Sequence, residues 1–130
     1  MPVFYKIDKE HRLVMTTASG VFGFAEMLGH QDLLLRDPDF DPAYSQLLDF
    51  THVTKVEMDS EDVRKLAARC GFWPCSRRAI LVNTDIEFGF ARMFEIFREN
   101  AGGKGIKVFR NLDDALSWIF PADTQQAAFE

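Results

Sequence analysis

The sequence alternates short β-prone runs with amphipathic helical segments, and this alternation constrains the fold more than any other feature. Two β-prone runs come first, at 3–7 and 13–17, and the polar residues between them predict a hairpin. Further strands are expected at 44–50, 79–82 and 105–110, and helices near 24–36, 60–70, 84–100 and 112–120. The predicted order is therefore β-β-α-β-α-β-α-β-α.

The predicted helix ends carry residues that are typical of helix caps and helix stops. Asp59 is expected to be an N-cap, because a short carboxylate accepts hydrogen bonds from the first amides of a helix. Thr84 and Glu87 fit a capping box at the start of the long third helix. Gly102-Gly103 is expected to stop that helix.

Alternating strands and helices predict an α/β fold with a mixed, mostly parallel sheet, whose opening hairpin makes one edge antiparallel. Ser19-Gly20 is expected to end the second strand. Residues 1–121 are expected to form a single domain, because no linker or repeat interrupts the chain. Residues 122–130 are expected to form a disordered C-terminal tail.

Charge and targeting signals exclude several classes of protein. The net charge of −5 argues against nucleic-acid binding, which needs clustered basic residues. Residues 37–62 hold eight acidic residues and one lysine, and 63–84 hold five basic residues and no acid, which predicts either two solvated faces or a bipolar surface for a protein partner. Without an evident signal peptide, membrane-spanning run or disulfide framework, a cytoplasmic location is expected.

The residues that catalysis or metal binding would need are not arranged for it. His11, His30 and His52 fall on different elements, and a metal site needs three or four converging ligands. The sequence has no Gly-x-Ser-x-Gly elbow, and Asp49 and Asp59 are explained by a strand end and a helix cap. The glycines at 102–105 follow a helix and precede a strand, the reverse of a phosphate loop. We therefore expect no enzyme activity, no cofactor and no metal.

Aromatic residues are the exception in composition, since 13 of the 130 residues are Phe. On the third helix Phe90 and Phe94 belong to a stripe, with Ile86, that the sheet is expected to bury, whereas Phe88 falls on the opposite face. Either Phe88 packs locally, or it contacts a second subunit or a pocket. The residues expected to line an apolar ligand or dimer surface are Phe72, Trp73, Phe88, Phe90, Phe94 and Trp118.

Three segments resemble a known family: LLDFTHVTKVEMDSEDV, RRAILVNTDIEFGFARMFEIF and KGIKVFRNLDDALSWI. They look like the SpoIIAA-like family, which is described as STAS-like and CRAL-TRIO-like, and the resemblance covers residues 3–120. It implies a STAS-like fold. None of these segments is a catalytic signature.

In regulatory STAS domains a serine in an Asp-Ser-Ser-Gly segment is phosphorylated at a helix N-terminus, which changes the partner surface. The matching segment here is Asp59-Ser60-Glu61-Asp62, so Glu61 stands at the usual acceptor position. The resemblance implies a partner-switch surface at Asp59, Ser60, Glu61 and Arg64, with Ser60 either a phosphosite or an ordinary first-turn serine.

Two functions follow as expectations. The first is a non-enzymatic STAS-like module that regulates or binds a protein partner. The alternative, implied by the CRAL-TRIO-like resemblance, is a carrier or sensor that holds a lipid-like apolar molecule in a pocket between helices and sheet. A homodimer is expected in either case. A cavity beneath the Phe-rich helix would favour the carrier, and a solid core would favour the partner module.

Overall fold

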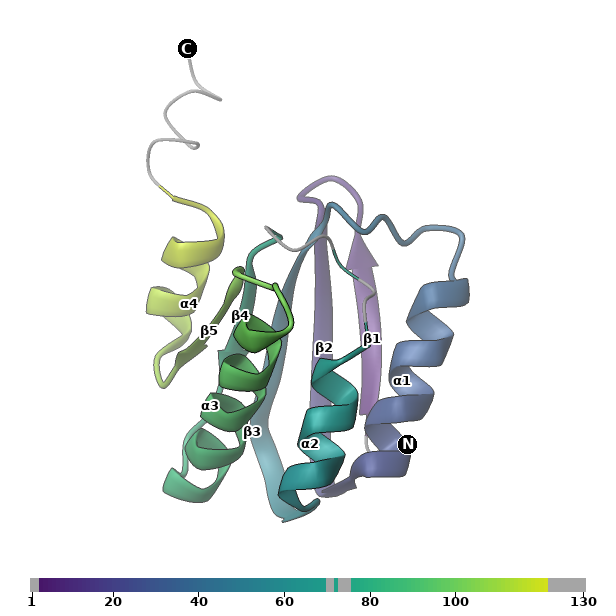
Figure 1. The fold of residues 1–130 in the computed structure, drawn as a ribbon. Coiled ribbons are helices and arrows are strands. Elements are labelled where there is room, and N and C mark those ends of the chain that lie inside the picture. The colour runs from purple at the N-terminus through teal and green to yellow at the C-terminus, as the bar shows by residue number, and fades with distance from the viewer. Residues whose placement is uncertain (1–2, 70–71, 73–75, 122–130) are drawn as a thin grey trace.

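In the part of the chain that it describes, residues 3–69, 72 and 76–121, the computed structural model has five strands and four helices in the predicted order (Figure 1). The expected tail at 122–130 lies outside the described residues. The strands are β1 (Val3–Asp8), β2 (Leu13–Gly23), β3 (Ser45–Glu57), β4 (Arg78–Leu81) and β5 (Ile106–Phe109), and the helices are α1 (Phe24–Arg36), α2 (Ser60–Ala67), α3 (Asp85–Asn100) and α4 (Leu112–Ile119).

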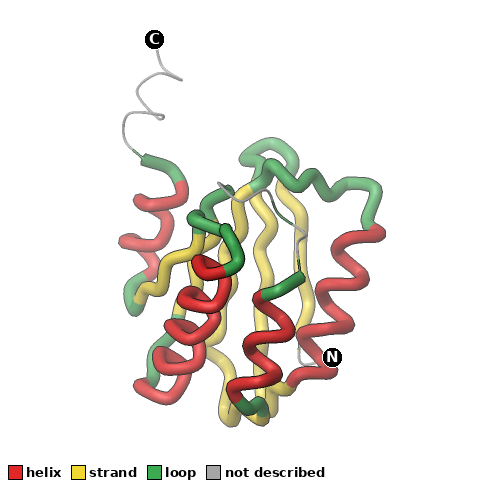
Figure 2. The backbone as a smooth tube through the Cα atoms, viewed as in Figure 1, coloured by secondary structure: helices red, strands yellow, loops and turns green. Residues whose placement is uncertain are grey.

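The strands form one sheet in the order β1-β2-β3-β4-β5. β1 pairs with β2 in antiparallel fashion, and every later pair is parallel, so the predicted mixed, mostly parallel sheet is confirmed. Each parallel crossover steps to the next strand in the same direction, and right-handed connections therefore place α1, α2 and α3 on one face. Figures 1 and 2 show these three helices in front of the sheet and α4 set apart from them beside β5.

The core has a part on each face of the sheet. Ile80 on β4 belongs to the larger apolar cluster, which includes Met27 of α1 and Ala91 of α3. Its neighbour Ala79 belongs to a second cluster with Ala115 and Ile119 of α4. Because successive side chains of a strand point to opposite faces, α4 must cover the face that the other helices leave open. All four residues of β4 are buried, as a strand covered on both faces requires.

The second strand does not end at Ser19-Gly20 as predicted but continues to Gly23. The pairing of β2 with β3 shifts in register between Thr17 and Ser19 and again between Gly20 and Val21. Gly20 has a φ of 65°, a left-handed conformation that glycine adopts without the strain of a Cβ. The glycine therefore bends the strand by a bulge instead of terminating it.

The third strand is also longer than predicted, since β3 runs from Ser45 to Glu57. It pairs with β4 only over Gln46–Asp49 but with β2 along almost its whole length. The far parts of β2 and β3 therefore project beyond the end of β4 as a two-stranded extension. This extension forms one wall of the pocket described below.

The helix caps agree with the sequence. Asp59 accepts from the amide of Asp62 at 2.8 Å, and the Asp62 carboxylate accepts from the Asp59 amide at 3.2 Å, a reciprocal capping box. Thr84 accepts from the amide of Glu87 at 3.1 Å, so it is the predicted N-cap. The Glu87 carboxylate accepts from the amide of Asn83 and not from Thr84, so the return contact lies one residue earlier than predicted.

Candidate functional site

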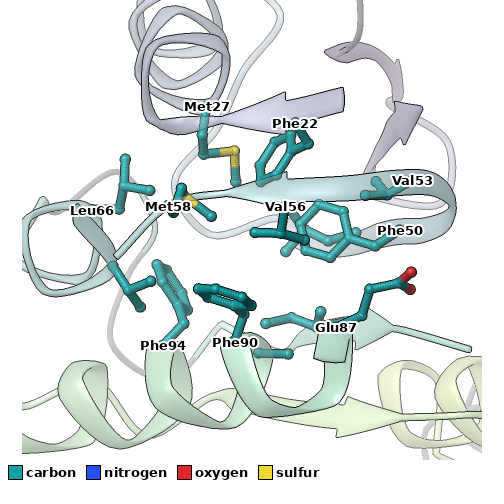
Figure 3. Close-up of a pocket in the computed structure, with 14 residues that line it drawn as sticks. Phe22, Met27, Phe50, Val53, Val56, Met58, Leu66, Glu87, Phe90 and Phe94 are labelled. Atoms are coloured by element: carbon teal, nitrogen blue, oxygen red, sulfur yellow. The ribbon is translucent and has the colours of Figure 1, made fainter. Parts of the chain in front are cut away.

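An apolar pocket lies beneath α3, between α2, α3 and the helix-covered face of the sheet (Figure 3). It encloses about 580 Å³ of space between atoms, counting the part that is open to solvent. Among the described residues that line it, Glu87 is the one ionisable side chain. The other lining residues are Phe22, Met27, Leu48, Phe50, Val53, Val56, Met58, Val63, Leu66, Ile80, Phe90, Ala91 and Phe94.

The two-stranded extension of the sheet builds the floor of the pocket. Phe50, Val53 and Val56 come from β3, and Phe22 from β2 packs against Phe50 with ring centroids 5.2 Å apart. Short α2 closes one side because its apolar residues face inward while its charged residues face water. In Figure 3, Phe90 and Phe94 project from α3 toward these strand residues.

Two methionines give this pocket an adaptable wall. Met27 from α1 is 6% exposed, and Met58, just before α2, is partly buried against the same cluster. A methionine side chain is unbranched and polarisable, so it changes rotamer to fit ligands of different shape. The pocket is therefore suited to apolar groups of varied outline.

Glu87 stands at the edge of the pocket and is 5% exposed. Its carboxylate accepts from the backbone amide of Asn83 at 3.3 Å, and it lies in the first turn of α3, where the helix dipole favours negative charge. This side chain is explained by the helix start. The remaining lining is apolar, which suits binding and offers no converging groups for acid–base chemistry.

The prediction of which α3 face is buried was only partly right. Phe90 and Phe94 do face the pocket, but Ile86, which belonged to the same predicted stripe, is 70% exposed. Phe88 is half-buried against the main core cluster, where the guanidinium of Arg110 lies 4.7 Å from its ring centroid. The innermost residue is Ala91, whose small side chain lets the helix approach the sheet closely. The helix is therefore rotated from its predicted orientation.

The other predicted surface rings are also covered. Phe72 is 8% exposed and packs edge-on against Phe40, with centroids 5.1 Å apart. Trp118 is half-buried against Phe109, and the Arg77 guanidinium lies 5.3 Å from the centroid of the Trp118 ring. Trp73 lies outside the described residues. Among the described residues, the exposed large apolar side chains are instead those of Phe4, Val21, Leu33, Leu35, Ile86, Ile96 and Leu112.

The predicted partner-switch residues lie together on the exposed start of α2. Asp59 is the N-cap, and Ser60 is the first helical residue and faces solvent. Glu61 and Arg64 form an ion pair one turn apart, and the hydrogen bond from Arg64 lowers the pKa of the Glu61 carboxyl below its ordinary value. The Glu61 carboxylate, at the position of the usual phospho-acceptor, is therefore paired with the guanidinium of Arg64.

A buried polar chain that the sequence analysis missed crosses the same face of the sheet between α1 and β4. The Nε of Arg78 donates to the side-chain oxygen of Gln46 at 3.1 Å, and the Gln46 amide nitrogen donates to the Thr16 hydroxyl at 2.9 Å. The Thr16 oxygen lies 3.2 Å from Nε2 of His30. These four side chains are each at most 8% exposed.

The direction of this chain fixes the orientation of the Gln46 amide and constrains the contact between Thr16 and His30. An arginine can only donate, so the Gln46 oxygen faces Arg78 and its nitrogen faces Thr16. The Thr16 hydroxyl still has its own hydrogen, and when it donates that hydrogen to Nε2 the imidazole proton lies on Nδ1. Burial, and secondly the positive charge of Arg78, lower the pKa of His30 from 6.5 to about 4, so the ring is neutral at pH 7.

The acidic groups considered for catalysis have structural partners. Asp49 lies inside β3, not at a strand end as predicted, and its carboxylate accepts from the amide and the hydroxyl of Thr51 at 2.9 and 2.6 Å. A search of the described residues finds no group of three or more His, Cys, Asp or Glu side chains that could hold a metal ion. Within the same residues, no helix combines the length and apolar character needed to cross a membrane.

The architecture defines a class: an α/β protein with three helices on one face of a five-stranded sheet, in which only the first strand is antiparallel. This is the SpoIIAA-like fold, as expected from the resemblance. The chain is similar to an uncharacterised DUF3478-family protein of Shewanella loihica PV-4 with a SpoIIAA-like fold, at a TM-score of 0.59 and 19% identity over 90% of this chain and 93% of that one. No protein-family model and no curated protein matches the sequence.

Proposed function

We propose that this protein is a non-enzymatic binding module that holds an apolar small molecule in the pocket beneath α3, as a carrier or sensor. The observation that carries the proposal is the pocket itself. It lies where the Phe-rich helix crosses the sheet, and its described lining is apolar except for Glu87 at the edge. Ligand pockets are typically concave and lined by apolar and aromatic side chains, with few polar groups.

The incomplete burial of apolar side chains around this pocket supports the same function. A fully packed core would maximise dispersion contacts, and apolar space left unfilled forfeits them. Phe50, Val56 and Phe94 are only partly buried although they pack against the main core cluster. An apolar ligand would complete the burial of these side chains.

A binding titration tests this function, with 1-decanol as a neutral apolar probe and calorimetry as the readout. Ala91 is 4% exposed and lines the pocket from α3, so Ala91→Leu fills part of the space with added methyl groups. Decanol is expected to bind the wild type, and Ala91→Leu to weaken binding about tenfold or more, the equivalent of a few buried CH₂ groups.

The matched control is Ala25→Leu, since Ala25 is an exposed residue of α1 and the change adds the same methyl groups outside the pocket. This control is expected to bind decanol as the wild type does. Absence of decanol binding to the wild type, or equal binding by both variants, would contradict the function.

The exposed start of α2 favours a second candidate, which is regulation of a protein partner. Val63 and Leu66 line the pocket, while Glu61 and Arg64 lie on the exposed side of the same short helix. A ligand beneath α2 would therefore be sensed on a surface that a partner could bind. If Ser60 is a phosphosite of such a switch, Ser60→Ala abolishes phosphate labelling by a cognate kinase. Unchanged labelling and unchanged capture of the partner would exclude a phosphorylation switch at Ser60.

A homodimer remains part of the proposal, but the rings expected to form it are covered within the chain. Phe88 lies beneath Arg110 and Trp118 beneath Arg77. Exposed aliphatic residues such as Ile86 and Ile96 on α3 are better candidates for the contact. Light scattering tests this: Ile86→Glu is expected to lower the mass from dimer to monomer, and a wild type that is already monomeric would contradict the dimer.

A further inference from the structure

A second pocket adjoins the first one and has a different chemical character. It lies between α1, the residues that follow α2, and the buried polar chain, and encloses about 410 Å³, counting the part that is open to solvent. Its described lining combines the polar residues His30, Gln31, Gln46, Arg69 and Arg78 with the apolar residues Met27, Leu34, Leu35, Phe40 and Phe72.

Three of the polar lining residues each have a buried polar atom that no described residue satisfies. These atoms are Nδ1 of His30, the side-chain oxygen of Gln31 and Nε of Arg69. Leaving a buried donor or acceptor without a partner costs about 1–3 kcal/mol, so three such atoms at one pocket are unusual in a native fold.

Two of these atoms are hydrogen-bond donors. Nδ1 of His30 is a donor in the tautomer in which Nε2 accepts from the Thr16 hydroxyl, and the Nε of an arginine always carries a hydrogen. The Gln31 amide supplies a donor as well when its oxygen and nitrogen exchange places. The donors of His30 and Arg69 therefore call for a group that accepts hydrogen bonds.

The charges around the pocket favour a negatively charged acceptor. Arg69 uses its Nη2 for an ion pair with Asp32, which leaves its Nε on the buried side. Arg78 also lines the pocket, so its positive charge lies close to the same site. Buried anions are stable only where hydrogen-bond donors and opposite charges meet them, and both are provided here.

The two pockets meet at one described residue that lines both. This residue is Met27. The Arg78 guanidinium lies 4.6 Å from the ring centroid of Phe72, which lines the second pocket, and 5.8 Å from that of Phe94, which lines the first. A molecule that displaces the flexible Met27 side chain would extend from one pocket into the other.

From these observations we infer that the ligand is an amphipathic carboxylic acid, with its apolar chain in the pocket beneath α3 and its carboxylate in the second pocket, bound by the Nδ1 of His30 and the Nε of Arg69. This inference rests on the proposed function and assigns its ligand class. The carboxylate satisfies the unpartnered donors, and the chain fills the apolar space.

Calorimetric titration with decanoate and with 1-decanol, below their aggregation concentrations, separates the two claims. Decanoate is expected to bind the wild type about tenfold tighter than decanol, because charge-assisted hydrogen bonds are stronger than neutral ones. Decanol binding without any preference for decanoate would overturn the carboxylate site and leave the proposed function intact. Failure of both probes would overturn the proposed function itself.

Variants at the half-exposed Arg69 test the carboxylate site with little effect on the core. Arg69→Met is expected to weaken decanoate binding about tenfold and to leave decanol within about twofold. Asp32→Asn removes the same ion pair but keeps the cation, so decanoate binding should be unchanged or tighter. Arg64→Met, an exposed arginine of α2 outside the pocket lining, is the matched control with no effect. Equal loss in Arg69→Met and Asp32→Asn would assign the effect to the ion pair and overturn the inference.

Discussion

The side-chain oxygen of Gln46 accepts a hydrogen bond from the Nε of Arg78 at 3.1 Å, inside the layer between the sheet and its helices. Gln46 is 1% exposed and Arg78 is 8% exposed. A charged side chain is buried at such a place only when hydrogen bonds hold it, and this contact also fixes the direction of the chain through Thr16 to His30. The direction of the hydrogen bonds along this chain therefore depends on Gln46.

Loss of the glutamine amide should be strongly destabilising. Gln46→Leu removes the acceptor for the Nε of Arg78 and the donor to the hydroxyl of Thr16, and we expect the free energy of unfolding to fall by about 2–4 kcal/mol in urea denaturation. Gln31→Leu is the control, because the Gln31 oxygen has no partner among the described residues and its loss should cost less than about 1 kcal/mol. Equal effects of the two changes would contradict the proposed chain.

The free energy of unfolding should decrease as the pH is lowered through the range in which an unfolded histidine becomes protonated. The folded protein keeps His30 neutral down to about pH 4, because burial and Arg78 lower its pKa, whereas unfolded histidine takes up a proton near pH 6.5. The unfolded state then binds more protons, so the free energy of unfolding should drop by about 3 kcal/mol as the pH falls from 7 to 4.

Comparison with His30→Leu isolates this contribution. The exposed His11, whose pKa Asp8 raises, acts in the opposite direction, whereas Asp8, Asp37 and Glu61, whose pKa values are lowered by hydrogen bonds, act in the same direction as His30. Both effects are present in the wild type and in the variant. The pH slope of unfolding between pH 7 and 4 should therefore be flatter in His30→Leu, and identical slopes would show that His30 is not buried as a neutral ring.

The start of α2 should contribute to stability through Asp59 and not through Ser60. Asp59→Ala removes the acceptor for the Asp62 amide and is expected to cost about 1 kcal/mol in thermal or urea unfolding. Ser60→Ala, on the solvent-exposed side of the same turn, should change stability by less than about 0.5 kcal/mol. A large loss in Ser60→Ala would mean that this serine has a structural role and would weaken its use as a regulatory probe.

Alanine substitutions at two glycines should have opposite effects, because Gly103 is packed against a side chain whereas Gly89 only lowers the helix propensity of α3. A Cβ on Gly103 would lie 2.6 Å from the Nε of Arg98. The Arg98 side chain is buried and donates to the carbonyl of Ala67 at 3.1 Å, so it has little room to move. Gly103→Ala is therefore expected to destabilise the protein by about 1–3 kcal/mol. An added Cβ on the exposed Gly89 of α3 meets no atom within 4 Å, and Gly89→Ala should stabilise by about 0.5–1 kcal/mol. Effects of the same sign would contradict this account of the α3 end.

Local signals in the sequence were sufficient to predict the order of elements and the helix starts. Asp59 and Thr84 are caps as predicted, because capping depends on residues three apart in sequence. Gly20 was misinterpreted, since the same residue type ends strands and bulges them, and only the pairing with β3 distinguishes the two.

The candidate site was harder to predict because its parts are distant in sequence. Phe90 and Phe94 were predicted to line an apolar ligand or dimer surface, and they line the pocket, but the rotation of α3 depends on how Ala91 meets the sheet, which a helical periodicity does not specify. Gln46 lies 32 residues from Arg78, its hydrogen-bond partner. No local pattern indicates such a pair, because the second pocket forms only where the strands lie side by side in the sheet.

The most direct test of the central claim is methionine-methyl NMR during a titration with decanoate. Met27 lines both pockets and Met58 lines the one beneath α3, whereas Met15 packs on the opposite face of the sheet, against the cluster that contains α4. If the pocket beneath α3 binds the apolar chain, the Met27 and Met58 methyl signals should shift together and saturate, while the Met15 signal stays in place. Unchanged Met27 and Met58 signals, or equal shifts at Met15, would contradict the account.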